Sequence, residues 1–205
     1  MDEHMLLLEI RTVKDLVPFV NGIMEPGGKN IIILDLKKDC FSPMSETEFA
    51  EVKGILFDPY LIAVLILDCE FTMSLYEKMY AFDLCLISEN GALQFDPHHR
   101  KGLRFLHLLF APKASLGEEI RRLSSKELLS HGLANALLRN ASFYEDLESQ
   151  ILNLTLGRTR EQLHAIKSCM NRYKECSLMG QPLMTDPETA YFCQLALLKT
   201  EEEKK

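Results

Sequence analysis

Apolar and polar positions along this chain form two kinds of segment, continuous apolar runs and stretches with helical spacing. Apolar runs at 5–11, at 30–36 (NIIILDL) and at 60–67 (YLIAVLIL) predict β-strands. Residues 84–88 predict a further strand, and 92–95 a short one after a turn. In the two longest runs almost every position is apolar, which is typical of strands that are covered on both faces.

Helical spacing fills the gaps between these strands. Leu16, Phe19, Val20 and Ile23 fall on one face of a predicted helix over 15–24. Ser45 and Glu48 form a capping box for a helix over 46–56, and 72–81 is predicted as the next helix. Strand and helix therefore alternate, and this alternation predicts a parallel sheet with helices as crossovers.

The C-terminal half is predicted to be helical. Helices are expected at 125–131, 143–155 and 160–175. Further capping boxes are Ser115 with Glu118, Ser124 with Glu127, and Ser142 with Glu145. We expect an α/β core over 1–140 and a helical region over 141–205 that mediates oligomer formation. The apolar stripe for that contact is Leu163, Ile166, Met170 and Tyr173.

Composition narrows the class of protein. The chain has 205 residues, of which 47% are hydrophobic and 26% charged, as in globular domains. A formal net charge of -7 argues against binding to nucleic acid or to an anionic membrane through a basic surface. The N-terminus lacks a positively charged region before its apolar stretch, so we expect no signal peptide and a cytoplasmic protein. The six cysteines form no C-x-x-C pair, which predicts reduced thiols and no metal site.

Three segments resemble the crotonase (enoyl-CoA hydratase/isomerase) family. Residues 59–64 (PYLIAV) are similar to the family's P-V-I-A-A-V strand, and residues 83–90 (DLCLISEN) to its D-I-R-I-A-S-E-N segment. Residues 126–135 (KELLSHGLAN) resemble its E-A-L-E-L-G-L-V-N segment. The resemblance implies a crotonase-like α/β fold of repeated β-β-α turns, with a helical C-terminal region and a trimer or a dimer of trimers.

The resemblance also implies an oxyanion hole for acyl-CoA thioesters, made of two backbone N–H groups. The family places one donor in an A-G-A-D loop after the first core strand and the other in a triple glycine. Here the loop reads KKDCFSPMS, and the triple glycine falls on Met73, Ser74 and Leu75. The backbone N–H groups of Ser74 and Leu75 remain candidate donors, but side chains at these positions are expected to narrow the site and to bury Met73 and Leu75.

The family's two catalytic glutamates map onto Glu77 and onto the neighbourhood of His98 and His99. Histidine transfers protons near neutral pH, so these three residues are candidate acid/base groups. A solvated helix face for Glu77 and a surface turn for the histidines are the alternatives. Lys37 and Lys38 are candidate ligands for the phosphates of CoA or of a phosphopantetheine arm, with charged surface as the alternative.

Two functions remain open from the sequence. The first is an auxiliary or acyl-thioester-binding subunit that lacks the oxyanion-hole glycines and works beside an acyl-thioester enzyme or a carrier protein. The second is an enzyme with a reshaped site that hydrates, dehydrates, decarboxylates or isomerises an acyl thioester. Neither function requires a cofactor beyond the thioester ligand itself.

Overall fold

The structure is a computed structural model that describes residues 3–10, 29–94, 122–130 and 132–178, the first range by its backbone alone. Its strands are β1 (Glu3–Ile10), β2 (Lys29–Leu36), β3 (Leu61–Leu67), β4 (Glu70–Thr72), β5 (Leu84–Ser88), β6 (Ala92–Gln94), β7 (Arg122–Ser124) and β8 (Ala136–Leu138). Its helices are α2 (Glu46–Leu56), α3 (Met73–Tyr76), α5 (Ser125–Ser130), α6 (Phe143–Thr155) and α7 (Arg160–Leu178), with 3-10 turns η2 (Met79–Ala81) and η3 (Asn140–Ser142).

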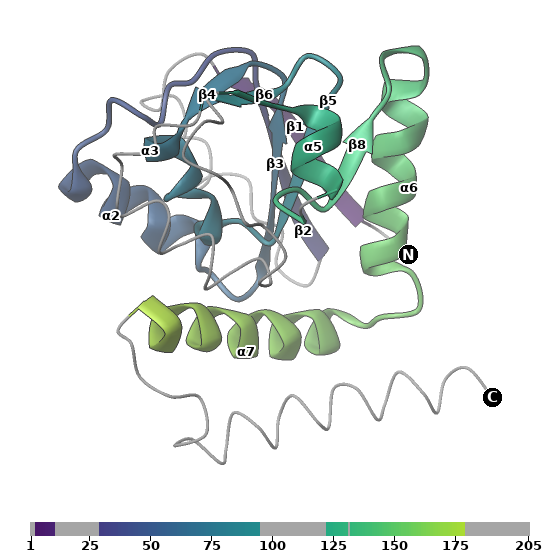
Figure 1. The fold of residues 1–205 in the computed structure, drawn as a ribbon. Coiled ribbons are helices and arrows are strands. Elements are labelled where there is room, and N and C mark those ends of the chain that lie inside the picture. Colours follow the sequence, from purple (N-terminus) through teal and green to yellow (C-terminus); the bar gives the residue numbers. More distant parts are fainter. Residues whose placement is uncertain (1–2, 11–28, 95–121, 131, 179–205) are drawn as a thin grey trace.

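A five-stranded parallel sheet forms the centre, in the order β1-β2-β3-β5-β8 (Figure 1). The predicted strands 30–36, 60–67 and 84–88 are its three central strands, and they are parallel and adjacent as expected. A second sheet has the order β4-β6-β7, in which β6 runs parallel to β4 and antiparallel to β7. The α/β fold class is therefore confirmed. The sequence does not predict β4, β7 and β8, because three residues are too few to show a period. β6 is equally short, and it is predicted from the turn that precedes it.

Both faces of the central sheet are covered, because alternate residues of β2 and β3 enter two separate apolar cores. One core joins Ile32, Leu34, Leu36, Ala63 and Leu65 to Phe49, Val52 and Leu56 of α2. The other joins Ile31, Ile33, Ile62, Val64 and Ile66 to Leu147 and Ile151 of α6 and Leu163 of α7. This double coverage explains the continuous apolar runs in the two strands.

The helix predicted over 72–81 is wrong as a single element. It is divided into α3 and the 3-10 turn η2, since the N–H groups of Lys78, Ala81 and Phe82 all donate to carbonyls three residues back. The side chains of Met73, Leu75, Tyr76, Lys78, Met79 and Ala81 are all buried. A straight amphipathic helix buries only the side chains on one face, about 100° wide. The 3-10 turns after α3 change the direction of the chain, so that more side chains of this short segment face the core.

Two of the predicted capping boxes are present. Ser45 and Glu48 cap α2 reciprocally, and Ser124 and Glu127 make the same exchange before α5. The box predicted at Ser142 is wrong. Its hydroxyl donates to Asp146, a carboxylate that also accepts two hydrogen bonds from the Arg139 side chain. The box predicted at Ser115 and the helix predicted over 15–24 lie outside the described residues.

Gly91 occupies a position that has no room for a side chain. A Cβ added there would lie 2.4 Å from Cγ1 of Ile87 and 2.6 Å from the carbonyl oxygen of Leu67. We expect Gly91→Ala to lower the free energy of unfolding by about 1–3 kcal/mol, because the backbone of β3 cannot yield. Urea unfolding would measure this loss.

The control for that experiment is Gly54→Ala, on α2, where no atom lies within 4 Å of the added Cβ. Alanine is the better helix former by about 1 kcal/mol, so the control should raise the stability. Equal effects of the two substitutions would contradict the packing at Gly91.

The long helix α7 crosses the end of the sheet at which β3 and β5 begin (Figure 1). Polar side chains attach it there. Lys167 donates to the carbonyl of Leu56 and to Asp83, Asn171 donates to Phe57, and Lys174 donates to Phe82. Asp83 lies 2.8 Å from Nζ of Lys167 and 3.6 Å from Nζ of Lys174. This polar anchor, defined as Asp83, Lys167 and Lys174, joins the C-terminal region to the core.

The predicted apolar stripe of α7 divides between two environments. Leu163 packs into the core beside α6, whereas Met170 is 46% exposed. The side chain of Tyr173 lies outside the described residues. The contribution of 141–205 to an oligomer stays a prediction. Within the described ranges, no helix has the length and apolar character needed to cross a membrane.

Candidate functional site

The fold brings together the two segments in which the sequence predicted backbone donors. One is the loop 37–45 between β2 and α2, and the other runs from the end of β4 through α3. The hydroxyls of Ser42 and Thr72 lie 2.6 Å apart, and the Ser74 hydroxyl donates to the carbonyl of Ser42 over 3.1 Å. Nζ of Lys78 donates to the carbonyl of Phe41 over 2.9 Å. We call this place the loop–helix junction.

A carboxylate lies at the centre of the loop–helix junction. Asp39 accepts the N–H of Ser42 at 2.9 Å and the N–H of Thr72 at 3.2 Å, and it also accepts the Ser42 hydroxyl. One backbone N–H from each segment thus already binds a negative charge of the chain itself. The sequence does not predict this role of Asp39, although the residue lies in the loop that replaces the A-G-A-D of the crotonase family.

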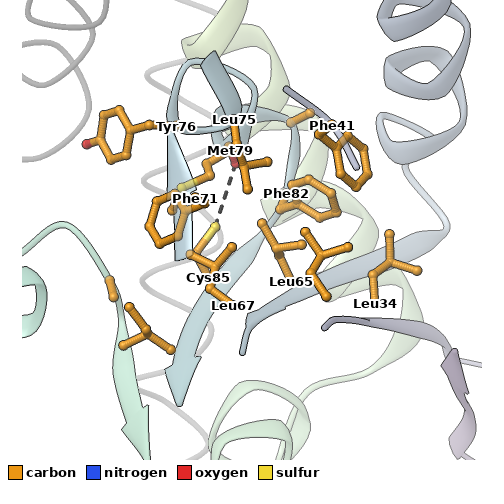
Figure 2. Close-up of a cluster of buried hydrophobic side chains, with 14 of the residues drawn as sticks. Leu34, Phe41, Leu65, Leu67, Phe71, Leu75, Tyr76, Met79, Phe82 and Cys85 are labelled. Atoms are coloured by element: carbon orange, nitrogen blue, oxygen red, sulfur yellow. Dashed lines mark hydrogen bonds between the residues drawn. The ribbon is translucent and has the colours of Figure 1, made fainter. Parts of the chain in front are cut away.

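Met73 and Leu75 point away from solvent. Their exposed fractions are 2% and 0%, which confirms the expectation that both would be buried. Figure 2 shows Leu75 in one apolar cluster with Phe41, Met79 and Phe82. The start of α3 is therefore fixed by packing as well as by the hydrogen bonds of the junction. The N–H groups of Ser74 and Leu75 belong to the first turn of α3, where no acceptor exists within a helix.

Ser74 is partly buried, between these two buried neighbours. The amine of Lys78 lies 3.2 Å from its hydroxyl and 5.9 Å from the centre of the Phe49 ring. Lys78 is only 7% exposed. Burial lowers the pKa of Lys78, against the opposing charges of Glu46, Asp39 and Glu77. Glu77, a candidate acid/base group, is the partly buried C-cap residue of α3 and acts on this lysine through its charge.

Lys37 and Lys38 have different surroundings. Lys37 forms ion pairs with Asp35 and Asp68, at 2.9 Å and 2.5 Å, at the ends of β2 and β3. Burial acts to lower the pKa of Lys37, but the hydrogen bonds to the two carboxylates outweigh it and raise the pKa. Lys38 is exposed. Of the two candidate phosphate ligands, Lys38 is therefore the one whose charge is not shared with these carboxylates.

Asp68 collects hydrogen bonds at the ends of three neighbouring strands. Besides Lys37, it accepts the side chains of Ser88 and Asn90. Burial opposes these bonds, and their sum lowers the pKa of the carboxyl. Lys37, Ser88 and Asn90 all bind Asp68, so their hydrogen-bonding groups are used within the protein. We infer that this cluster has a structural role and fixes the ends of β2, β3 and β5 beside the junction.

The remaining candidates give no second site within the described part of the chain. His98 and His99 lie outside it, so their predicted role stays a prediction. No group of three or more metal-binding side chains occurs among the described residues. Among the described residues, Cys69 and Cys85 are thiols outside any disulfide. Burial raises the pKa of Cys69 and that of Cys85 to about 12, which keeps both as unreactive thiols near neutral pH.

The fold is the crotonase fold. No protein-family model and no curated protein matches this sequence. The chain is similar to an enoyl-CoA hydratase/isomerase family protein from Silicibacter pomeroyi, with 13% identity and a TM-score of 0.63, over 98% of this chain and 97% of that one. It is also similar to a protein from Mycobacterium abscessus assigned as an enoyl-CoA hydratase/isomerase, with 11% identity and a TM-score of 0.67, over 97% and 86%.

A third similar structure contains a ligand. It is methylmalonyl-CoA decarboxylase in complex with 2S-carboxypropyl-CoA, with 12% identity and a TM-score of 0.62, over 96% of this chain and 86% of that one. The TM-scores establish the architecture, whereas identities this low leave the chemistry to be argued from the residues of this chain. The resemblance noted in three sequence segments is thus confirmed at the level of the fold.

Proposed function

We propose that this protein binds acyl thioesters, of CoA or of a carrier-bound phosphopantetheine, at the loop–helix junction. It works there as an auxiliary subunit without ordinary hydratase chemistry. Its partners are further copies of itself, in a trimer or a dimer of trimers, and a cytoplasmic acyl-thioester enzyme or carrier protein. The fold supports the thioester as ligand, since a similar structure is a complex with a CoA derivative.

The position of Asp39 is the reason that we propose a role without hydration. An oxyanion hole works because preorganised N–H groups meet the negative charge that develops on the thioester oxygen. At the junction, the N–H groups of Ser42 and Thr72 already meet the Asp39 carboxylate. Because these two N–H groups are already occupied, they cannot stabilise the enolate oxygen that forms during hydration, and the arrangement supports binding without hydration.

The second candidate function is an enzyme with a reshaped site. One observation favours it: the Ser74 hydroxyl and the buried Lys78 amine lie within hydrogen-bond distance at this same junction. Such a pair is suited to attack on a carbonyl carbon and does not suit the addition of water to a double bond.

We expect butyryl-CoA to bind more tightly than free CoA when both are titrated calorimetrically. Thr72→Trp should weaken butyryl-CoA binding by at least about tenfold, or about 1.4 kcal/mol. Thr72 is exposed at the end of β4 and touches Ser42, so an indole there covers the loop–helix junction.

The matched control is Thr47→Trp, at another exposed threonine, on α2. It should leave the affinity unchanged. The absence of butyryl-CoA binding by the unmodified protein, or an equal loss in both variants, would overturn the proposed site.

A further inference from the structure

The loop–helix junction contains a serine and a lysine in direct contact. Ser74 and Lys78 are four residues apart, so both side chains leave the same side of one helical turn. Nζ of Lys78 lies 3.2 Å from Oγ of Ser74, while the Ser74 hydroxyl donates to the carbonyl of Ser42. A small rotation of that hydroxyl would direct its proton to the lysine nitrogen.

Lys78 differs from the other buried lysines of the structure. Lys167 and Lys174 both lie within ion-pair distance of Asp83. For Lys78 the structure gives two contacts with hydrogen-bond acceptors, the Phe41 carbonyl and the Ser74 hydroxyl, and the nearby ring of Phe49. No ion pair joins it to a carboxylate of the described residues. A buried amine without such a partner favours its neutral form, which is a base.

We propose that Ser74 is a nucleophile and Lys78 its general base, and that the pair hydrolyses acyl thioesters bound at the junction. This inference rests on the proposed thioester ligand and adds a reaction to it. A serine hydroxyl requires an adjacent base to become nucleophilic, and the contact between these two side chains supplies one. Met73 and Leu75, packed in the core on either side, hold the serine in a fixed position.

The reaction has two steps. In the first, Lys78 accepts the Ser74 proton, Oγ forms a bond to the acyl carbon, and the carbon–sulfur bond breaks. The thiolate then takes the proton from the lysine ammonium group. In the second step, a water molecule attacks the acyl-serine ester and transfers a proton to Lys78, which returns it to the departing Oγ. The net change is thioester plus water to carboxylic acid plus thiol.

A fluorophosphonate probe tests the pair without any thioester, since it modifies activated serines directly. We expect the unmodified protein to gain one probe mass, and peptide mapping to place it on Ser74. Ser74→Ala should abolish this labelling. Ser130→Ala, at an exposed serine of α5, should leave it unchanged.

Lys78 also joins α3 to the loop through the Phe41 carbonyl, so a structural role must be separated from a role as base. Lys78→Arg keeps a cationic donor for that carbonyl but cannot accept a proton. It should reduce the labelling rate by at least about 100-fold, the effect typical of a general base, while thermal unfolding remains close to that of the unmodified protein.

The rate of labelling should also increase with pH as Lys78 loses its proton. The charged groups around this lysine are Glu46 from α2, Asp39 from the loop and Glu77 from α3 itself. Near-normal labelling in Lys78→Arg, or a rate independent of pH, would overturn the assignment of Lys78 as the base.

The outcomes separate this inference from the proposed function. Butyryl-CoA binding without labelling of Ser74 overturns the nucleophile and leaves the binding role in place. Labelling of Ser74 without butyryl-CoA binding supports the serine–lysine pair and overturns the thioester as its ligand. Labelling, binding and release of free CoA together support both.

Discussion

Asp83→Asn should lower the free energy of unfolding by about 3–5 kcal/mol, the cost of removing one partner from a buried ion pair. Asp83 faces Lys167 and Lys174, whose side chains are only 4% and 5% exposed. Burial lowers the pKa of both lysines, and the charge of Asp83 opposes that effect. Without the carboxylate, two buried ammonium groups lose their counter-charge. Chemical denaturation followed by circular dichroism would measure the loss.

Two comparisons test the origin of that loss. Glu70→Gln makes the same chemical change in an ion pair with Arg122 at the surface, and it should change the stability far less. Lys167→Met added to Asp83→Asn should recover part of the loss, because it removes one of the unpaired charges. If Asp83→Asn lowers the free energy of unfolding by less than about 1 kcal/mol, the polar anchor contributes no more than a surface ion pair, and the prediction is wrong.

Crotonyl-CoA should not be hydrated by this protein at a detectable rate. Each oxyanion-hole donor contributes about 3–4 kcal/mol, so the loss of one lowers the rate by roughly 10²–10³-fold and the loss of both by roughly 10⁴–10⁶-fold. Here the N–H groups of Ser42 and Thr72 bind Asp39, and the packing of Met73 and Leu75 fixes the adjacent backbone. Chromatography with mass detection should find no 3-hydroxybutyryl-CoA.

Product identity is essential in this assay, because the serine–lysine pair would release crotonate and free CoA from the same substrate. Those two products are counted separately from the hydrated thioester. Hydration at the ~10 s⁻¹ typical of enzymes would show that the loop–helix junction rearranges and that the glycines of the family are dispensable here.

The core of the fold was predictable from the sequence because its signals are local. The runs at 30–36 and 60–67 are apolar at nearly every position, and such runs bury as strands wherever both faces are covered. The capping boxes at Ser45 and Ser124 are likewise decided within four residues. Burial of Met73 and Leu75 also followed from their apolar character.

The candidate site depends on contacts between residues that are far apart in the sequence. The bonds from the Thr72 N–H to Asp39 and from Lys78 to Phe41 join the loop to α3 across more than thirty positions. In the sequence, Asp83-Leu84-Cys85 shows only its similarity to a family segment, and only the structure shows Asp83 bound to α7. The division of 72–81 into two short helical turns also depends on distant residues. The apolar side chains that surround this segment in the fold decide how many of its own side chains are buried.

The sequence by itself therefore determined the class of fold, the central strands and the replacement of the family's triple glycine by Met73, Ser74 and Leu75. Only the tertiary structure decided which charges meet: Asp39 with two backbone N–H groups, Asp83 with two lysines, and Lys78 with Ser74 and no carboxylate partner among the described residues. The physical reason is range. Hydrophobic periodicity and capping act within a few residues, whereas the protonation and reactivity of a buried group are set by whatever the fold places around it.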